Sequence, residues 1–156
     1  MPLTIANNLT SFKNKKRTHL ITDEPFHLGG GIGVWDDNTS NMNVTYSPTG
    51  NTYLILQSSN TNAYAGVEYP CTPYSTYKFT GELLVTIGGT GGGKVKFGTS
   101  AGSNAMDEGV VARSGSAVTV TKDFNVGNRT TFWLSFYITN TGVYQYWDEI
   151  KIEETG

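Results

Sequence analysis

Residues 130–139 read "TTFWLSFYIT", in which large apolar residues alternate with polar or aromatic ones. Successive side chains of a β-strand point to opposite faces, so this alternation predicts a strand with one buried and one outward face. The buried face comprises Phe132, Leu134, Phe136 and Ile138, and the outward face comprises Thr131, Trp133, Ser135, Tyr137 and Thr139.

The same two-residue period recurs along the chain, and helical periodicity is missing. "TYLILQ" (52–57) places Leu54 and Leu56 on one face. Strands separated by frequent turns predict an all-β, two-sheet antiparallel sandwich or a barrel, with about ten strands and no substantial helix. Clusters of Gly and Asn mark expected turns at 29–33, 59–62, 88–93, 98–104 and 125–128. Other inward residues are expected to be Tyr77, Phe79, Leu83, Val85 and Ile87 in 75–87, and Val118, Val120 and Phe124 in 117–126.

The stretch "VYQYWDEIKIE" (143–153) also alternates, but it carries an acid in its middle. An unbroken strand would put Asp148 on the same face as the apolar side chains, where a carboxylate needs a partner. The expected core face is Tyr144, Tyr146, Asp148, Ile150 and Ile152, and the expected outward face is Val143, Gln145, Trp147, Glu149 and Lys151.

Length and charge bound the class of protein. With 156 residues, the chain is expected to be a single domain over 1–156, with 1–17 as a candidate extended N-terminal arm. A net charge of −2 and 15% charged residues argue against binding to nucleic acid. The sequence has no apolar run long enough for a membrane helix and no secretory signal, so we expect folding in a cytoplasm and no membrane partner.

Several apparent catalytic or cofactor motifs fail on inspection. "GGTGGGKV" (88–95) has Val95 where a phosphate-binding loop needs Ser or Thr, and the residues that follow alternate as a strand. Cys71 is the sole cysteine, which excludes an intrachain disulfide. The acids that could pair for glycoside cleavage sit where ordinary loop or strand-edge acids sit; they are Asp23, Glu24, Glu68, Asp107 and Glu108. We therefore expect no enzyme and no cofactor.

As a whole, the chain resembles the carbohydrate-binding-module type of galactose-binding-like jelly roll, a family found beside glycosidases and in phage tail and virion proteins. The resemblance implies a single jelly-roll sandwich. It rests on five stretches in the family's order, "NNLTSF" (7–12), "NTYLILQ" (51–57), "EYPCTPYSTYKFTGELLV" (68–85), "KVKFGTS" (94–100) and "YWDEIKIEE" (146–154).

The resemblance also suggests a partner for Asp148. In many such modules a structural calcium joins an acid after the first Ser-Phe to the aspartate of the last strand, and here Lys13 occupies that place. We hypothesise an ion pair between Lys13, or failing that Arg17, and Asp148 in place of the metal. No metal is expected, and Asp148 is the one weak calcium candidate. The alternative is a hydrogen bond from backbone to Asp148 at a strand end.

The family implies binding, and aromatic rings can stack on the faces of sugars. The expected platform for a glycan or a protein partner is Trp133 and Tyr137, extended by Trp147 and Gln145 if the two strands are neighbours; packing of these rings within the chain is the remaining alternative. One hypothesis is a non-enzymatic phage virion protein, either a head decoration protein or a tail appendage. It would be located in the virion, in contact with other virion proteins or with itself as a homo-oligomer such as a trimer. The alternative is a carbohydrate-binding module for extracellular or cell-surface glycans.

Overall fold

The computed structural model describes residues 21–22, 36–37, 41–46, 54–88, 92–111 and 115–156. These residues form strands and turns, and none of them lies in a helix that could span a membrane. Lys13, Arg17 and the predicted 1–17 arm lie outside the described residues. The strands are β1 (Ile21–Thr22), β2 (Asp36–Asp37), β3 (Met42–Tyr46), β4 (Leu54–Ser58), β5 (Ala63–Pro70), β6 (Thr76–Ile87), β7 (Gly93–Gly98), β8 (Asp107–Val111), β9 (Val118–Asn125), β10 (Thr131–Ile138) and β11 (Tyr144–Glu154).

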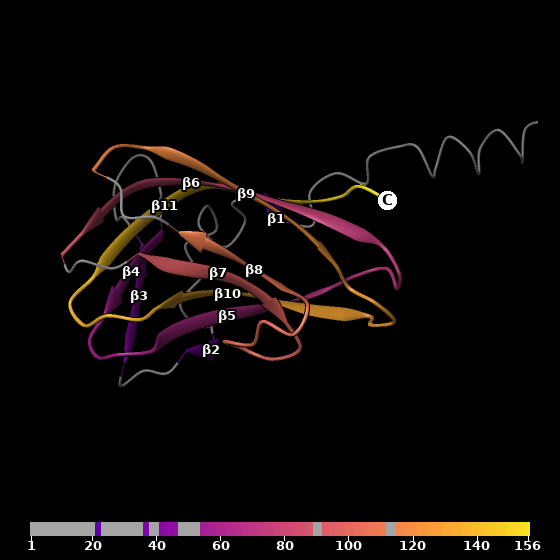
Figure 1. Ribbon diagram of the computed structural model, residues 1–156, viewed down its shortest axis with the longest axis horizontal. Coiled ribbons are helices and arrows are strands. Elements are labelled where there is room, and N and C mark those ends of the chain that lie inside the picture. Colours follow the sequence, from indigo (N-terminus) through magenta and orange to yellow (C-terminus); the bar gives the residue numbers. More distant parts are fainter. Residues whose placement is uncertain (1–20, 23–35, 38–40, 47–53, 89–91, 112–114) are drawn as a thin grey trace, which may run out of the picture.

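Two antiparallel sheets face each other, as Figure 1 shows. One sheet has the order β3-β4-β11-β6-β9, with β1 also paired to β11. The other has the order β2-β5-β10-β7-β8. Neighbours in both sheets are mostly distant in sequence, as in a jelly roll. The prediction of an all-β jelly-roll sandwich is confirmed, with eleven strands in the described part of the chain.

The core lies between the sheets and is rich in aromatic rings. The inward face predicted for β10 is confirmed, since Phe132, Leu134, Phe136 and Ile138 are all buried. From the opposite sheet, Phe124 of β9 stacks on Phe97 of β7 with ring centroids 4.0 Å apart. Face-to-face burial of this kind joins the two layers and fixes which face of β10 remains outside.

The face predicted for the first half of β11 is wrong. Val143, Gln145 and Trp147 are buried, whereas Ile150 and Ile152 are buried in the second half as expected. Pairing with β6 shifts register between Tyr146 and Trp147 and again between Asp148 and Lys151, and Glu149 has a φ of +51°. A β-bulge adds an unpaired residue and exchanges the two faces of a strand. The inward set therefore changes from odd to even positions at 148–150.

The register shift between Tyr146 and Trp147 also changes which side chains are buried at the end of β6. Leu83 is buried as predicted, but Ile87 is half exposed and Thr86 is buried instead. Tyr146 pairs with Val85 while Trp147 pairs with Leu83, so Leu84 is the extra residue of the bulge. Thr86 and Ile87 have therefore exchanged faces relative to the prediction.

Candidate functional site

The outward face of the five-stranded sheet carries the predicted aromatic pair. Trp133 and Tyr137 are both half-buried on this face, as the sequence predicted. Trp133 pairs with Glu68 of β5 and Gly98 of β7, and Tyr137 pairs with Tyr64 and Lys94. Directly opposed residues of antiparallel strands project to the same side. We call this surface the outer face; it comprises Tyr64, Gly66, Glu68, Thr131, Trp133, Ser135, Tyr137, Lys94, Lys96 and Gly98.

A connection between β7 and β8 folds back over the middle of the outer face. We call residues 99–105 the crossing loop. The Gly102 N–H donates to Ser135 Oγ at 2.9 Å, and Ser135 is fully buried although it projects outward. A Cβ on Gly66 would lie 3.1 Å from Ala101, and one on Gly98 would collide with Ser103. The loop can approach the sheet this closely because Gly66 and Gly98 have no side chain.

The crossing loop separates Trp133 from Tyr137, because it lies on Ser135 between them. Four residues of strand also set the two aromatic positions roughly 13 Å apart. The outer face is therefore two surfaces, and the platform predicted to join Trp133 with Tyr137 is interrupted.

Tyr137 is engaged by its own chain. The Lys96 ammonium nitrogen lies 3.5 Å from the centroid of the Tyr137 ring, a cation–π contact. The Tyr137 hydroxyl donates to Asn62 Oδ1 at 2.8 Å. One face of the ring and the hydroxyl are thus occupied, which leaves less of Tyr137 for a ligand than the sequence suggested.

Trp133 has no such engagement within the described residues. Its indole N–H donates no hydrogen bond there, and its ring meets no other aromatic ring or cation. The carboxylate-bearing Glu68 beside it is exposed. A half-exposed indole with an unused donor, next to an acceptor, suits a ligand that has both an apolar face and hydroxyl groups.

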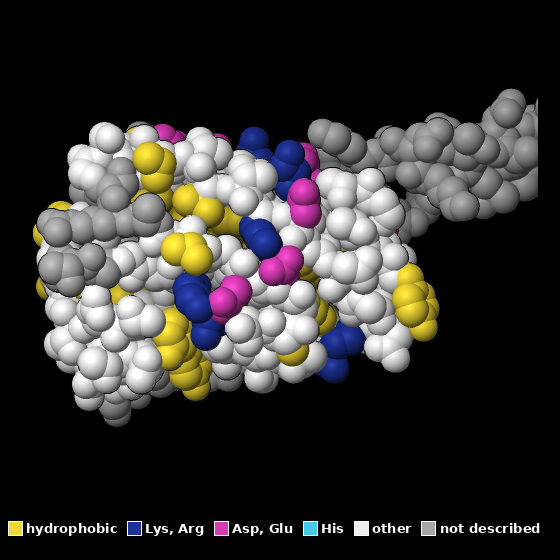
Figure 2. Space-filling model, viewed as in Figure 1, with side chains coloured by type: hydrophobic (Ala, Val, Ile, Leu, Met, Phe, Trp, Pro, Cys, Tyr) yellow, Lys and Arg dark blue, Asp and Glu magenta, His cyan; other side chains and the backbone are white. Residues whose placement is uncertain are grey.

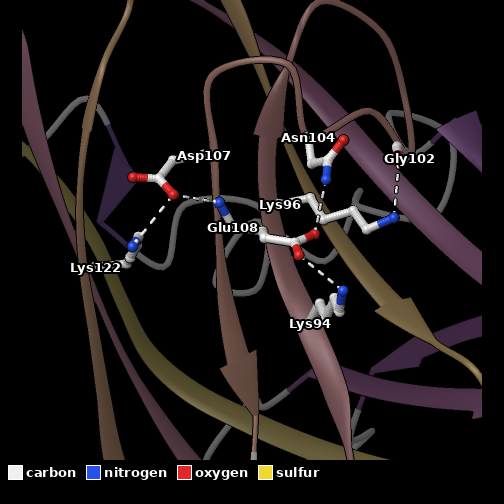
Figure 3. A network of polar contacts seen from close by, with 7 residues as sticks. All are labelled: Lys94, Lys96, Gly102, Asn104, Asp107, Glu108 and Lys122. Atoms are coloured by element: carbon white, nitrogen blue, oxygen red, sulfur yellow. Dashed lines mark hydrogen bonds and ion pairs between the residues drawn. The ribbon is translucent and has the colours of Figure 1, made fainter.

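Charged side chains hold the crossing loop and the adjoining strands in place (Figure 3). Lys96 Nζ donates to the Gly102 carbonyl oxygen at 3.3 Å, and Asn104 Nδ2 donates to Glu108 Oε2 at 2.9 Å. Lys94 Nζ pairs with Glu108 Oε1 at 2.7 Å. The hydrogen bond from Lys94, with another from Asn104, lowers the pKa of Glu108. Burial is the main cause that lowers the pKa of Lys96.

A second ion pair joins the two sheets where their edge strands β8 and β9 meet. Lys122 Nζ of β9 lies 3.2 Å from Asp107 Oδ1 of β8. Figure 2 shows basic and acidic side chains lying side by side in the middle of this view, over the region of β8 and β9. Asp107 and Glu108, two of the acids considered for glycoside cleavage, are thus each held by a lysine.

Trp147 and Gln145, predicted to extend the platform, lie in the core instead. Trp147 Nε1 donates to Gln145 Oε1 at 3.1 Å, and both residues are buried. Gln145 Nε2 and the facing Thr86 Oγ1 are buried without a hydrogen-bond partner in the described part of the protein. Because the bulge reverses the strand face, neither Trp147 nor Gln145 can contact a ligand on the surface.

Asp148 lies at the bulge of β11 and is half-buried. Its Oδ1 accepts a hydrogen bond from the Glu149 N–H at 2.9 Å, so backbone supplies one partner, although at a bulge within β11 and not at a strand end. The predicted ion pair with Lys13 stays a prediction. Among the described residues, no group of three or more His, Cys, Asp or Glu side chains could hold a metal ion.

Cys71 lies at the end of the sandwich where β5 leads into β6. Its thiol donates to the Arg129 carbonyl oxygen at 3.4 Å. Burial raises the pKa of the Cys71 thiol, which disfavours the reactive thiolate.

The site differs from the sequence-based prediction mainly by its loop. Glu68, Lys96 and the crossing loop were not anticipated as parts of it, because their neighbours depend on strand register. The sequence did carry a sign of the loop in the small residues Gly66, Gly98 and Ser135. These lie on neighbouring strands and leave room above the sheet for a crossing segment.

The fold is a jelly roll similar to that of solved carbohydrate-binding modules, which confirms the fold that the family resemblance implied. No family model and no curated protein matches the sequence.

Three solved structures illustrate the likeness. A domain of tailspike protein 4 from bacteriophage CBA120 has a TM-score of 0.61 at 12% identity over 88% of this chain and 21% of the tailspike chain. The module TmCBM61, solved with β-1,4-galactotriose, has a TM-score of 0.56 at 12% identity over 88% and 99% of the two chains. A module from Cellvibrio mixtus lichenase 5A, solved with cellotriose, has a TM-score of 0.55 at 11% identity over 78% and 91%.

Proposed function

We propose that this domain is a non-catalytic glycan-binding protein that holds a sugar on Trp133. The observation that carries the proposal is the Trp133 ring, which projects from the outer face without an aromatic or hydrogen-bonding partner among the described residues. Stacking of a sugar on the indole would bury apolar area, and hydroxyl groups would find the Glu68 carboxylate. The solved neighbours that hold cellotriose and β-1,4-galactotriose support a glycan as ligand.

The described acids that were considered for glycoside cleavage support binding without catalysis. Glycoside cleavage needs two carboxyl groups across a cleft, one of them able to donate a proton. Glu108 is held by Lys94 and Asn104, which stabilise its ionised form, and Asp107 is paired with Lys122. Glu68 remains as an acceptor beside Trp133, a role that binding alone requires.

A phage virion is the location we propose for this protein, as a head decoration protein or a tail appendage. The likeness to a tailspike domain over 88% of this chain supports a virion role. Self-association into a closed oligomer, or contact with other virion proteins, would then place many copies of the site on one particle. Weak sugar binding at each copy would add up through multivalency.

Substitution of Trp133 tests the glycan site. We expect Trp133→Ala to abolish binding of cello- or β-1,4-galacto-oligosaccharides in isothermal titration, with the thermal melting curve nearly unchanged. Tyr144→Ala is the matched control, because Tyr144 is a half-buried aromatic residue on the outside of the opposite sheet. Equal binding by the Trp133 variant and the wild type would refute the site.

The virion location needs a separate test. Sedimentation should show a closed oligomer, and tagged protein incubated with purified phage particles should co-sediment with them. A monomer that binds sugar but does not co-sediment with phage particles would favour an ordinary carbohydrate-binding module.

A further inference from the structure

We propose that the Trp133 site takes the end of a neutral glycan chain and excludes the interior of a long chain. The inference rests on the proposed glycan-binding function. It deepens that function by naming the part of the polysaccharide and the charge class that the outer face can accept.

The crossing loop closes one side of the site. A sugar stacked on Trp133 could extend along β10 toward Tyr137 only across Ser135. Ser135 is fully buried, and the Gly102 N–H lies 2.9 Å from its Oγ. Ala101 lies on Gly66, and Ser103 lies on Gly98. The loop thus touches all three strands β5, β10 and β7. A sugar chain that runs along these described strands therefore cannot pass beneath the loop.

The loop is fastened from both sides. Lys96 Nζ donates to the Gly102 carbonyl oxygen, and the Gly102 N–H donates to Ser135. The two peptide units on either side of the Gly102 Cα are therefore both held to the sheet. Asn104 is tied to Glu108, which is in turn paired with Lys94. The Figure 3 view shows Lys96 reaching to Gly102 and Asn104 reaching to Glu108. A chain passing through the site would have to break these contacts.

The open side of the site is short. From Trp133 to the first residue of β10, Thr131, the strand runs two residues, or roughly 7 Å, which is about one to two sugar rings in length. The site therefore has a closed wall on one side and a short shelf on the other. This shape suits a terminal sugar whose chain leads away from the loop.

The charges around Trp133 favour a neutral sugar. Glu68 is exposed and lies directly opposite Trp133, so a carboxylate on the sugar would meet a like charge. The two described lysines of the outer face are engaged elsewhere. Lys94 is paired with Glu108, and Lys96 is stacked on Tyr137 and bonded to the crossing loop.

A length series with the intact protein tests the inference. Cello- and β-1,4-galacto-oligosaccharides of one to six sugars are titrated, with Trp133→Ala as the control for the site. We expect each sugar added after the second to improve Kd by less than about twofold. A further sugar stacked on a ring would improve Kd roughly tenfold. A steady gain up to six sugars would overturn end recognition while the proposed function stands.

Two more measurements bear on the ends and on the charge. Limited endoglycanase digestion of a soluble neutral polysaccharide should raise the binding capacity per gram in proportion to new chain ends; constant capacity would overturn the inference. Oligogalacturonate should bind about fivefold more weakly than its neutral counterpart, and Glu68→Gln should remove the difference. If no oligosaccharide binds to the wild type, the proposed function falls and the inference falls with it.

Discussion

Substitution of Gly66 by Ala is a direct test of how the crossing loop sits on the sheet. A Cβ at this position would lie 2.6 Å from Ser135 Oγ and 3.1 Å from both Cα and Cβ of Ala101. Two carbon atoms rest at about 3.5–4.0 Å, so the loop must rise by roughly 0.4–0.9 Å. Overpacking of this kind costs about 1–3 kcal/mol. For a domain of this size, that lowers Tm by roughly 2–12 °C.

Replacement of a glycine also restricts the unfolded chain, which stabilises the folded state by about 0.4–1 kcal/mol. Gly115→Ala carries the same gain, and a Cβ at Gly115 meets no atom within 4 Å. The difference between the two variants in urea unfolding therefore isolates the clash. Ser135→Gly removes the closest contact, so Gly66→Ala should cost less in the Ser135→Gly background than in the wild type. A Gly66 variant as stable as the Gly115 variant would refute the described position of the loop.

Three further predictions concern the core, acid and metal. Trp147→Phe and Gln145→Leu each leave a buried polar group unpaired, which costs about 1–3 kcal/mol of stability. In denaturant unfolding, the double variant should lose about 0.5–3 kcal/mol less stability than the sum of the two single losses. Strict additivity of the two losses would contradict the hydrogen bond. Because the folded-state pKa of Glu108 is lowered from 4.5, its contribution to stability is present above that value and lost as pH falls through the folded-state pKa. Glu108→Gln should therefore flatten part of the acid limb of a pH–stability curve, and an unchanged limb would argue against the pairing. EDTA should leave Tm unchanged while Lys13→Met lowers it, if an ammonium neutralises Asp148; a fall in Tm with EDTA would restore a calcium ion there.

Simple alternation predicted β10 well because that strand pairs without a bulge along its whole length. Each of its residues has one partner on β5, and the inward set stays in phase from Phe132 to Ile138. The outward position of Trp133 followed from the same phase. The sequence therefore identified the central residue of the candidate site without any knowledge of the neighbouring strands.

The prediction for β11 failed because a bulge is a property of two strands. Assignment of Gln145 and Trp147 to the surface assumed one phase through Asp148, whereas the register with β6 changes there. A hint was available, since the large apolar residues change from odd positions, Val143 and Trp147, to even ones at Ile150. The loop over Ser135 was not predicted, because the small residues Gly66 and Gly98 are seen to flank Ser135 only once the neighbours of β10 are known.

The position of β11 has a consequence for biosynthesis. This strand follows all the others in sequence, yet it lies between β4 and β6 and also pairs with β1. A nascent chain cannot close this layer until residues 144–154 leave the ribosome, and until then the edges of β4 and β6 remain available to other chains. Slow translation or early termination before Tyr144 should therefore yield aggregates, and a chaperone that shields strand edges would be most useful in that interval.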